Sequence, residues 1–119
     1  MKILYFNKKV EAQCTSVKEA NKLFGGNKKY VLGLMSRIYA IENAENLKDI
    51  ICIPTFRFHK LVGDMEGYYA IDVTNKRDKW RIIMCPLDEK EKRMIPCKID
   101  EVSSTVQVVE IEEVSLHYE

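Results

Sequence analysis

The spacing of apolar residues changes from helical to alternating near Asp49, and this change limits the folds that the chain can adopt. In residues 31–41, apolar side chains recur every three or four positions, which predicts a helix with one buried face. Beyond Asp49, Pro54 prevents a continuous helix, and apolar residues alternate with their neighbours over residues 69–73. The sequence therefore predicts a helical first part followed by a sheet-forming second part.

The order of the predicted elements follows from capping residues, glycines and alternation. A first strand is expected at the start, then a helix that begins after Thr15 or Ser16 and ends at Gly25-Gly26, and a longer helix capped by Asn27. Three or four strands follow, within residues 51–61, 69–73, 80–85 and 106–118, and a charged connection spans 85–104. Short turns between strands favour antiparallel pairing. We therefore expect an α+β fold, with two N-terminal helices packed on an antiparallel sheet.

Length and composition predict a single domain over residues 1–119. No apolar run approaches the length of a transmembrane helix, and the first residues lack a signal-peptide core and cleavage site. We therefore expect a cytoplasmic protein. The four cysteines form no C-x-x-C pair, so their spacing predicts reduced, mostly buried thiols rather than a zinc site.

Charge is unevenly distributed along the chain, although the net charge is only +1. Residues 1–60 contain 11 Lys/Arg and 5 Asp/Glu, whereas residues 61–119 contain 8 Lys/Arg and 13 Asp/Glu. A basic first half is suited to contact with phosphates. Solvated helix faces explain the same charges without a ligand, so both interpretations stay open on charge alone.

Three stretches of the chain resemble a known family. RFHKLVGDMEGYYAID, followed by KWRII and then VVEIEEVSLH, is similar to the HigB branch of the RelE superfamily of bacterial toxins. The resemblance implies a RelE-type β-α-α-β-β-β fold and a small ribonuclease that enters the ribosomal A site and cuts mRNA there. It implies no metal or cofactor, and a small antitoxin with a helix-turn-helix domain as partner.

Metal-free RNA cleavage uses the ribose 2′-OH as nucleophile, and it needs a base, a cation beside the phosphorane and an acid for the leaving oxygen. Histidine suits both proton transfers, and arginine suits the charge. By the resemblance, His59 matches the first histidine of the family, Arg81 the arginine of the W-R-I strand and His117 the terminal histidine. Without a catalytic role, Arg81 would pair with an acidic residue of the last strand, such as Glu110 or Glu112.

The chain departs from the family pattern at three positions. Val62 stands where the family has a lysine, and Ser115 and Leu116 stand where it has aspartate and tyrosine. Lys60, two residues before Val62, can supply the missing charge if the strand is regular. At least two expected catalytic side chains are therefore absent, so either fewer groups carry the chemistry or this member is altered or inactive.

A basic turn precedes the W-R-I strand. Lys76, Arg77 and Lys79 can contact RNA or the ribosome, or they can form a solvated loop. The favoured hypothesis is a ribosome-dependent mRNA endoribonuclease, the toxin of a type II toxin–antitoxin system. The alternative is a catalytically degenerate module that binds a helix-turn-helix antitoxin or regulator. A gyrase poison of the ParE type is a third possibility.

Overall fold

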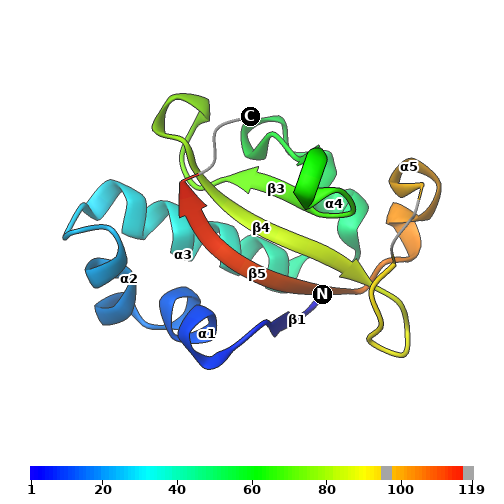
Figure 1. Ribbon diagram of the computed structural model, residues 1–119, viewed down its shortest axis with the longest axis horizontal. Helices are drawn as coiled ribbons and strands as arrows, with labels where there is room; N and C mark the ends of the chain where they lie inside the picture. Colours follow the sequence, from blue (N-terminus) through cyan, green and yellow to red (C-terminus); the bar gives the residue numbers. More distant parts are fainter. Residues whose placement is uncertain (95–97, 117–119) are drawn as a thin grey trace.

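The computed structural model describes residues 1–94 and 98–116, and a five-stranded sheet organises them. The strands lie in the order β1-β5-β4-β3-β2. Their bounds are β1 Lys2–Tyr5, β2 His59–Lys60, β3 Tyr69–Asp72, β4 Trp80–Leu87 and β5 Val108–Leu116. The long, curved pair β4 and β5 forms the middle of the sheet (Figure 1).

The helices begin where side chains can accept backbone N–H groups. Their bounds are α1 Lys8–Thr15, α2 Val17–Leu23, α3 Lys28–Asn43, α4 Leu47–Ile51 and α5 Ile99–Val102. Ser16 caps α2 and Asn27 caps α3, as predicted, through side-chain oxygens that accept from the third residue along. Asn7 and Asn46 cap α1 and α4 in the same way. Among the described helices, none has both the length and the apolar character to cross a membrane.

The core lies between the helices and one face of the sheet. The predicted stripe of α3, including Leu34, Ile38 and Ile41, is buried in the same cluster as Ile71 and Ile82 of the sheet. Burial of such aliphatic side chains stabilises the fold by about 1.5–3 kcal/mol each. The helical spacing in the sequence therefore identified the correct face of α3.

The predicted α+β fold is confirmed, with helices packed on a mostly antiparallel sheet. The expected number of N-terminal helices was wrong, because residues 8–15 form a further helix, α1, before the predicted one. Only Val10 and Cys14 of α1 are buried, so its sequence shows little helical spacing. The expectation of antiparallel pairing fails at β1, which pairs with β5 in parallel.

Two segments of the second half differ from their predicted form. Only His59 and Lys60 of residues 51–61 are in a strand, because α4 extends to Ile51 and a 3₁₀ turn follows at Pro54–Phe56. Strand β4 continues to Leu87, into the segment predicted as a connection. In a strand, the N–H and the carbonyl of one residue point to the same side. The Pro86 carbonyl accepts from Met94, on the side away from β5, so the N–H that proline lacks would not have bonded to β5, and the β4–β5 ladder is intact.

The second face of the sheet, opposite the helices, is called the helix-free face below. Side chains of Ala70 and Ile83 point to it, and a smaller apolar cluster covers them. Leu61, Met65 and Tyr68, from the turn between β2 and β3, form the rest of that cluster. This turn closes the centre of the helix-free face and leaves charged side chains on either side of it.

Candidate functional site

Strand register brings two of the predicted catalytic residues to the helix-free face. His59 lies opposite Ala70, and Arg81 lies opposite Asp72. Residues directly opposite each other in antiparallel strands share a face, and Ala70 and Asp72 are two positions apart on one strand. His59 and Arg81 therefore lie on the same side of the sheet, as the sequence required of a joint site.

The half-buried His59 side chain is held by a backbone carbonyl. Its Nδ1 lies 2.6 Å from the carbonyl oxygen of Arg57. A carbonyl oxygen only accepts hydrogen bonds, so Nδ1 must carry the proton in this contact. In the neutral imidazole, Nε2 is then the nitrogen able to take a proton, as a general base requires.

Arg57 links His59 to Asp72, and sequence reasoning missed both Arg57 and Asp72. Arg57 has a φ of +50°, a left-handed conformation that is uncommon for a residue with a Cβ atom. Its Nε donates to an Asp72 carboxylate oxygen at 3.0 Å. Asp72 is only 1% exposed, so its charge needs partners inside the protein. An aspartate within an otherwise apolar strand was the sequence signal that could have revealed this contact.

Arg81 is buried and occupied by internal contacts. It is 1% exposed, and its Nε lies 3.1 Å from the second Asp72 carboxylate oxygen. Its guanidinium also donates to the carbonyls of Asn75, Lys76 and Trp80. The alternative to catalysis was that Arg81 forms an internal ion pair with Glu110 or Glu112. Arg81 does form an internal ion pair, but its partner is Asp72. A catalytic role for Arg81 stays a prediction.

The basic turn, residues 76–79, packs on the Arg81 guanidinium, which donates to the carbonyl of Lys76. Lys76 and Arg77 are exposed, and Lys79 is half-buried. The Asn75 side chain accepts from the backbone N–H groups of Arg77 and Asp78 and so shapes the turn. The exposed cations thus project from a turn that is fixed from within. RNA binding by Lys76, Arg77 and Lys79 stays a prediction.

Lys60 is exposed and follows His59 in the chain, but it lies opposite Tyr69, so its side chain is on the other face of the sheet. The strand ends at Lys60, and Val62, 76% exposed, lies outside it. The side chains of Lys60 and Phe58 border a cavity of about 520 Å³ next to His59, closed on the far side by α5. Tyr69 and Ile51 of the core cluster also line this cavity, so it lies on the helix side of β2, although His59 borders it. The substitution of Lys60 for the family lysine stays a prediction.

The third predicted catalytic residue, His117, lies outside the described residues. The strand before it is described, and Ser115 lies opposite Arg81 at its end. Leu116, at the position of the family tyrosine, is 49% exposed. The register therefore places Ser115, near the end of β5, beside Arg81 of β4.

A second charged group lies at the other end of the helix-free face, and we call it the Arg93 cluster. Arg93 donates to Glu110 at 3.1 Å and to Glu112 at 2.9 Å, and it bonds to the Tyr68 hydroxyl and lies over its ring. Burial, followed by the hydrogen bond and negative charge of Glu110, raises the pKa of Glu112 to about 7. This end of the face is acidic.

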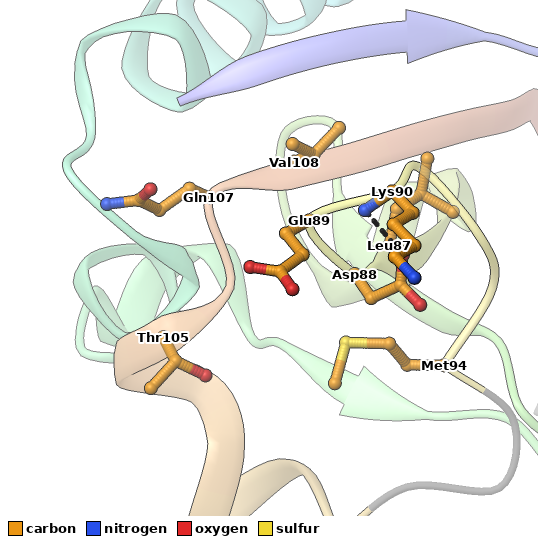
Figure 2. A pocket seen from close by; sticks show the side chains of 8 residues that line it. All are labelled: Leu87, Asp88, Glu89, Lys90, Met94, Thr105, Gln107 and Val108. Carbon is orange, nitrogen blue, oxygen red and sulfur yellow. Dashed lines mark hydrogen bonds between the residues drawn. The ribbon is translucent and has the colours of Figure 1, made fainter.

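A cavity of about 600 Å³ lies where β4 ends, between the loop that follows β4 and the segment that leads into β5 (Figure 2). Asp88 occupies its wall, but its carboxylate already accepts the backbone N–H groups of Lys90 and Lys92. Leu87 and Met94 add an apolar side, and no predicted site residue borders the cavity. Size alone therefore does not mark the candidate site.

The described cysteines behave as the sequence predicted in most respects. Cys14 and Cys85 are buried free thiols, and burial raises the pKa of Cys14 to about 12, so it stays protonated. Cys52 is exposed, and Cys97 lies outside the described residues. Within residues 1–94 and 98–116, no group of three or more His, Cys, Asp or Glu side chains is placed to hold a metal ion.

Comparison with known proteins supports the fold. No protein-family model matches the chain, and no curated protein sequence matches it. Among solved structures, a YoeB/ParE toxin from Agrobacterium tumefaciens matches with a TM-score of 0.50 and 15% sequence identity, over 99% of this chain and 100% of that one. At this identity the likeness shows a shared fold. This shared fold agrees with the α+β arrangement of helices on a mostly antiparallel sheet expected from the sequence.

Proposed function

We propose that this chain is the toxin of a type II toxin–antitoxin pair and that it cleaves mRNA on the ribosome. The observation that carries the proposal is the hydrogen bond of His59 Nδ1 to the Arg57 carbonyl, on the helix-free face of a fold shared with a YoeB/ParE toxin. With the proton on Nδ1, Nε2 is the basic nitrogen of the neutral ring. The likeness of the chain to the HigB branch supplies the reaction class.

In the proposed reaction, the His59 imidazole first turns out of its buried position, because Nε2 is shielded from solvent in this structure. Nε2 then takes the proton of the ribose 2′-OH, and the 2′-oxygen attacks the adjacent phosphate. Lys60 starts on the opposite face of the sheet from His59, but β2 is an edge strand, so its long side chain reaches around this edge to provide positive charge for the phosphorane oxygens. His117 gives a proton to the leaving 5′-oxygen. Arg81, buried against Asp72, acts from behind the site by holding the basic turn rather than by touching RNA.

Lys76, Arg77 and Lys79 bind the phosphates that flank the cleaved bond. Phosphate contacts position a nucleic acid without reading its sequence, and the basic turn joins the Asp72 side of the site through Arg81. The ribosome presents the mRNA, and an antitoxin with a helix-turn-helix domain is the protein partner. The cytoplasm, where translation occurs, is the proposed location.

The test is induction of this chain alone in a bacterial host, with growth followed and mRNA ends mapped. The proposal predicts growth arrest and new ends inside translated frames, both lost in His59→Ala. Gln107→Ala serves as the control because Gln107 is exposed and lies at the distant cavity. Growth arrest with intact mRNA and a DNA-damage response would instead point to the ParE-type activity.

A second function, the degenerate binding module, is favoured by one observation. Val62 and Leu116, at the positions of the family lysine and tyrosine, are exposed apolar residues with no chemistry for RNA cleavage. Well-expressed, folded protein that leaves growth and mRNA unchanged, yet binds its antitoxin, would select this function over the first.

A further inference from the structure

Asp72 is the most deeply buried charged group on the helix-free face besides Arg81. Each is 1% exposed. A carboxylate in such a position is destabilising by several kcal/mol unless charged partners surround it. Two guanidinium groups do so: Arg57 approaches one oxygen and Arg81 the other.

One branch of contacts from Asp72 leads to His59. The bond from Arg57 Nε to Asp72 holds the Arg57 side chain, while the backbone of Arg57 adopts its left-handed conformation. Such a backbone conformation is strained for a residue with a Cβ atom and persists only when contacts around it enforce it. The carbonyl of this same residue accepts the Nδ1 proton of His59. The side-chain contact of Arg57 thus fixes the carbonyl that orients the imidazole.

Another branch leads to the basic turn. Arg81, held by the Asp72 carboxylate, donates to the carbonyls of Asn75 and Lys76. Arg37 of α3 donates to the backbone carbonyls of Asp72 and Thr74, which secures the chain between the carboxylate and the turn. The carbonyls of Asn75 and Lys76 face Arg81, while the side chains of Lys76 and Arg77 are exposed.

We propose that Asp72 is the positioning residue of the site: it fixes the tautomer and orientation of His59 through Arg57 and the inner side of the basic turn through Arg81. The catalytic part of this inference rests on the proposed function. Asp72 is within the protein and does not touch RNA. It couples the residue that takes the proton to the turn that holds the phosphates.

The test is a long-range ¹H–¹⁵N spectrum of the histidine side chains, which reports which ring nitrogen carries the proton. The two histidine signals are distinguished with a His117→Gln variant. At a pH where the imidazole is neutral, the wild type should show His59 with its proton on Nδ1. In Asp72→Asn the His59 signals should move towards a mixture of tautomers. Asp88→Asn, which changes a carboxylate that organises a distant turn, should leave them unchanged.

Arg57→Gln is the second variant, used because Asp72→Asn can fail to fold. Arg57 is 30% exposed in its side chain, so the shorter glutamine is tolerated at the surface. Asp72 and Arg81 keep their contact in this variant. A wild-type His59 tautomer in either folded variant would overturn the proposal.

Cleavage assays on the same variants separate this proposal from the proposed function. If the wild type cuts mRNA, Asp72→Asn should lower the rate on the order of 100-fold, as expected when a reacting group is displaced by about 1 Å. An unchanged cleavage rate in folded Asp72→Asn would also overturn the positioning role. If the wild type does not cut mRNA, the proposed function fails, while the His59 tautomer still decides whether Asp72 positions the imidazole.

Discussion

The two ends of the helix-free face differ in which charge is in excess. Around Asp72, one carboxylate contacts two guanidinium groups, those of Arg57 and Arg81. In the Arg93 cluster, one guanidinium contacts two carboxylates, those of Glu110 and Glu112. The Asp72 end is therefore locally cationic and the Arg93 end locally anionic. Only the first can attract a phosphate backbone.

The two ends also differ in burial, and this difference determines how much each contributes to the free energy of unfolding. Asp72 and Arg81 are removed from solvent, whereas the Arg93 side chain is 38% exposed. Salt screens exposed pairs, but it hardly affects buried ones. The ion pairs of the cationic end are therefore a fixed part of the fold, whereas the strength of those at the anionic end changes with pH and salt.

The largest expected effect comes from removing the carboxylate at the cationic end. Asp72→Ala leaves the buried Arg81 guanidinium without its charge partner, which should lower the free energy of unfolding by about 3–5 kcal/mol. Arg93→Ala, at the exposed end, should lower it by about 1 kcal/mol or less. Urea denaturation of both variants measures the difference. Equal losses would show that the two ends do not differ in the way described.

Gly33 tests how the cationic end is fixed from the helix side. A Cβ atom at Gly33 would lie 2.5 Å from the Val73 carbonyl oxygen and 2.9 Å from the Thr74 side chain. Gly33→Ala should therefore lower the free energy of unfolding by about 1–3 kcal/mol, despite the better helix propensity of alanine. Ser36→Ala, exposed on the same helix, should change it by about 0.5 kcal/mol or less. A stabilising Gly33→Ala would contradict the close packing of α3 on this segment.

Charge reversal on each end tests the assignment of RNA binding. The double variant Lys76→Glu with Arg77→Glu should lower mRNA cleavage on the order of tenfold and weaken its dependence on salt. Lys90→Glu with Lys92→Glu makes the same change in net charge on exposed residues near the anionic end. This control should retain wild-type cleavage. The same loss in both double variants would mean that net charge, rather than the basic turn, governs RNA contact.

The smallest expected effect is the pH dependence of the anionic end. Because burial raises the pKa of Glu112 from 4.5 to about 7, the folded state binds this proton more tightly than the unfolded state. The resulting stabilisation is complete below about pH 4.5 and is lost as the pH rises through about 7. Glu112→Gln should remove this decline, on the order of 1–2 kcal/mol. The control is Glu113→Gln, on the exposed neighbour. Denaturation midpoints at pH 5 and pH 8 give the measurement, and an unchanged decline in Glu112→Gln would disprove the assignment.

Local patterns in the sequence predicted much of the fold. The apolar stripe of α3, the caps at Ser16 and Asn27 and the alternation in β3 all depend on neighbouring residues, and each was found where expected. The parallel pairing of β1 with β5 joins the two ends of the chain, so no local pattern encodes it. Helix α1 was missed because two buried positions are too few to show a period.

The candidate site was predictable in its residue types but not in its connections. The resemblance named His59 and Arg81, which do lie on one face of the sheet. It did not name Arg57, whose role depends on a left-handed backbone conformation that no sequence pattern marks at an arginine. Nor did it name Asp72, whose partners come from separate elements. Contacts between distant side chains require the folded structure.

The central claim is that the site with His59 activates a ribose 2′-OH. The most direct measurement is cleavage by purified protein on programmed ribosomes, with mRNA carrying a single 2′-deoxy nucleotide at the position cut in the all-ribose message. The account predicts cleavage of the all-ribose mRNA, ending in a 2′,3′-cyclic phosphate or 3′-phosphate, and none at the deoxy position. Cleavage of both messages at the same position and rate would contradict it.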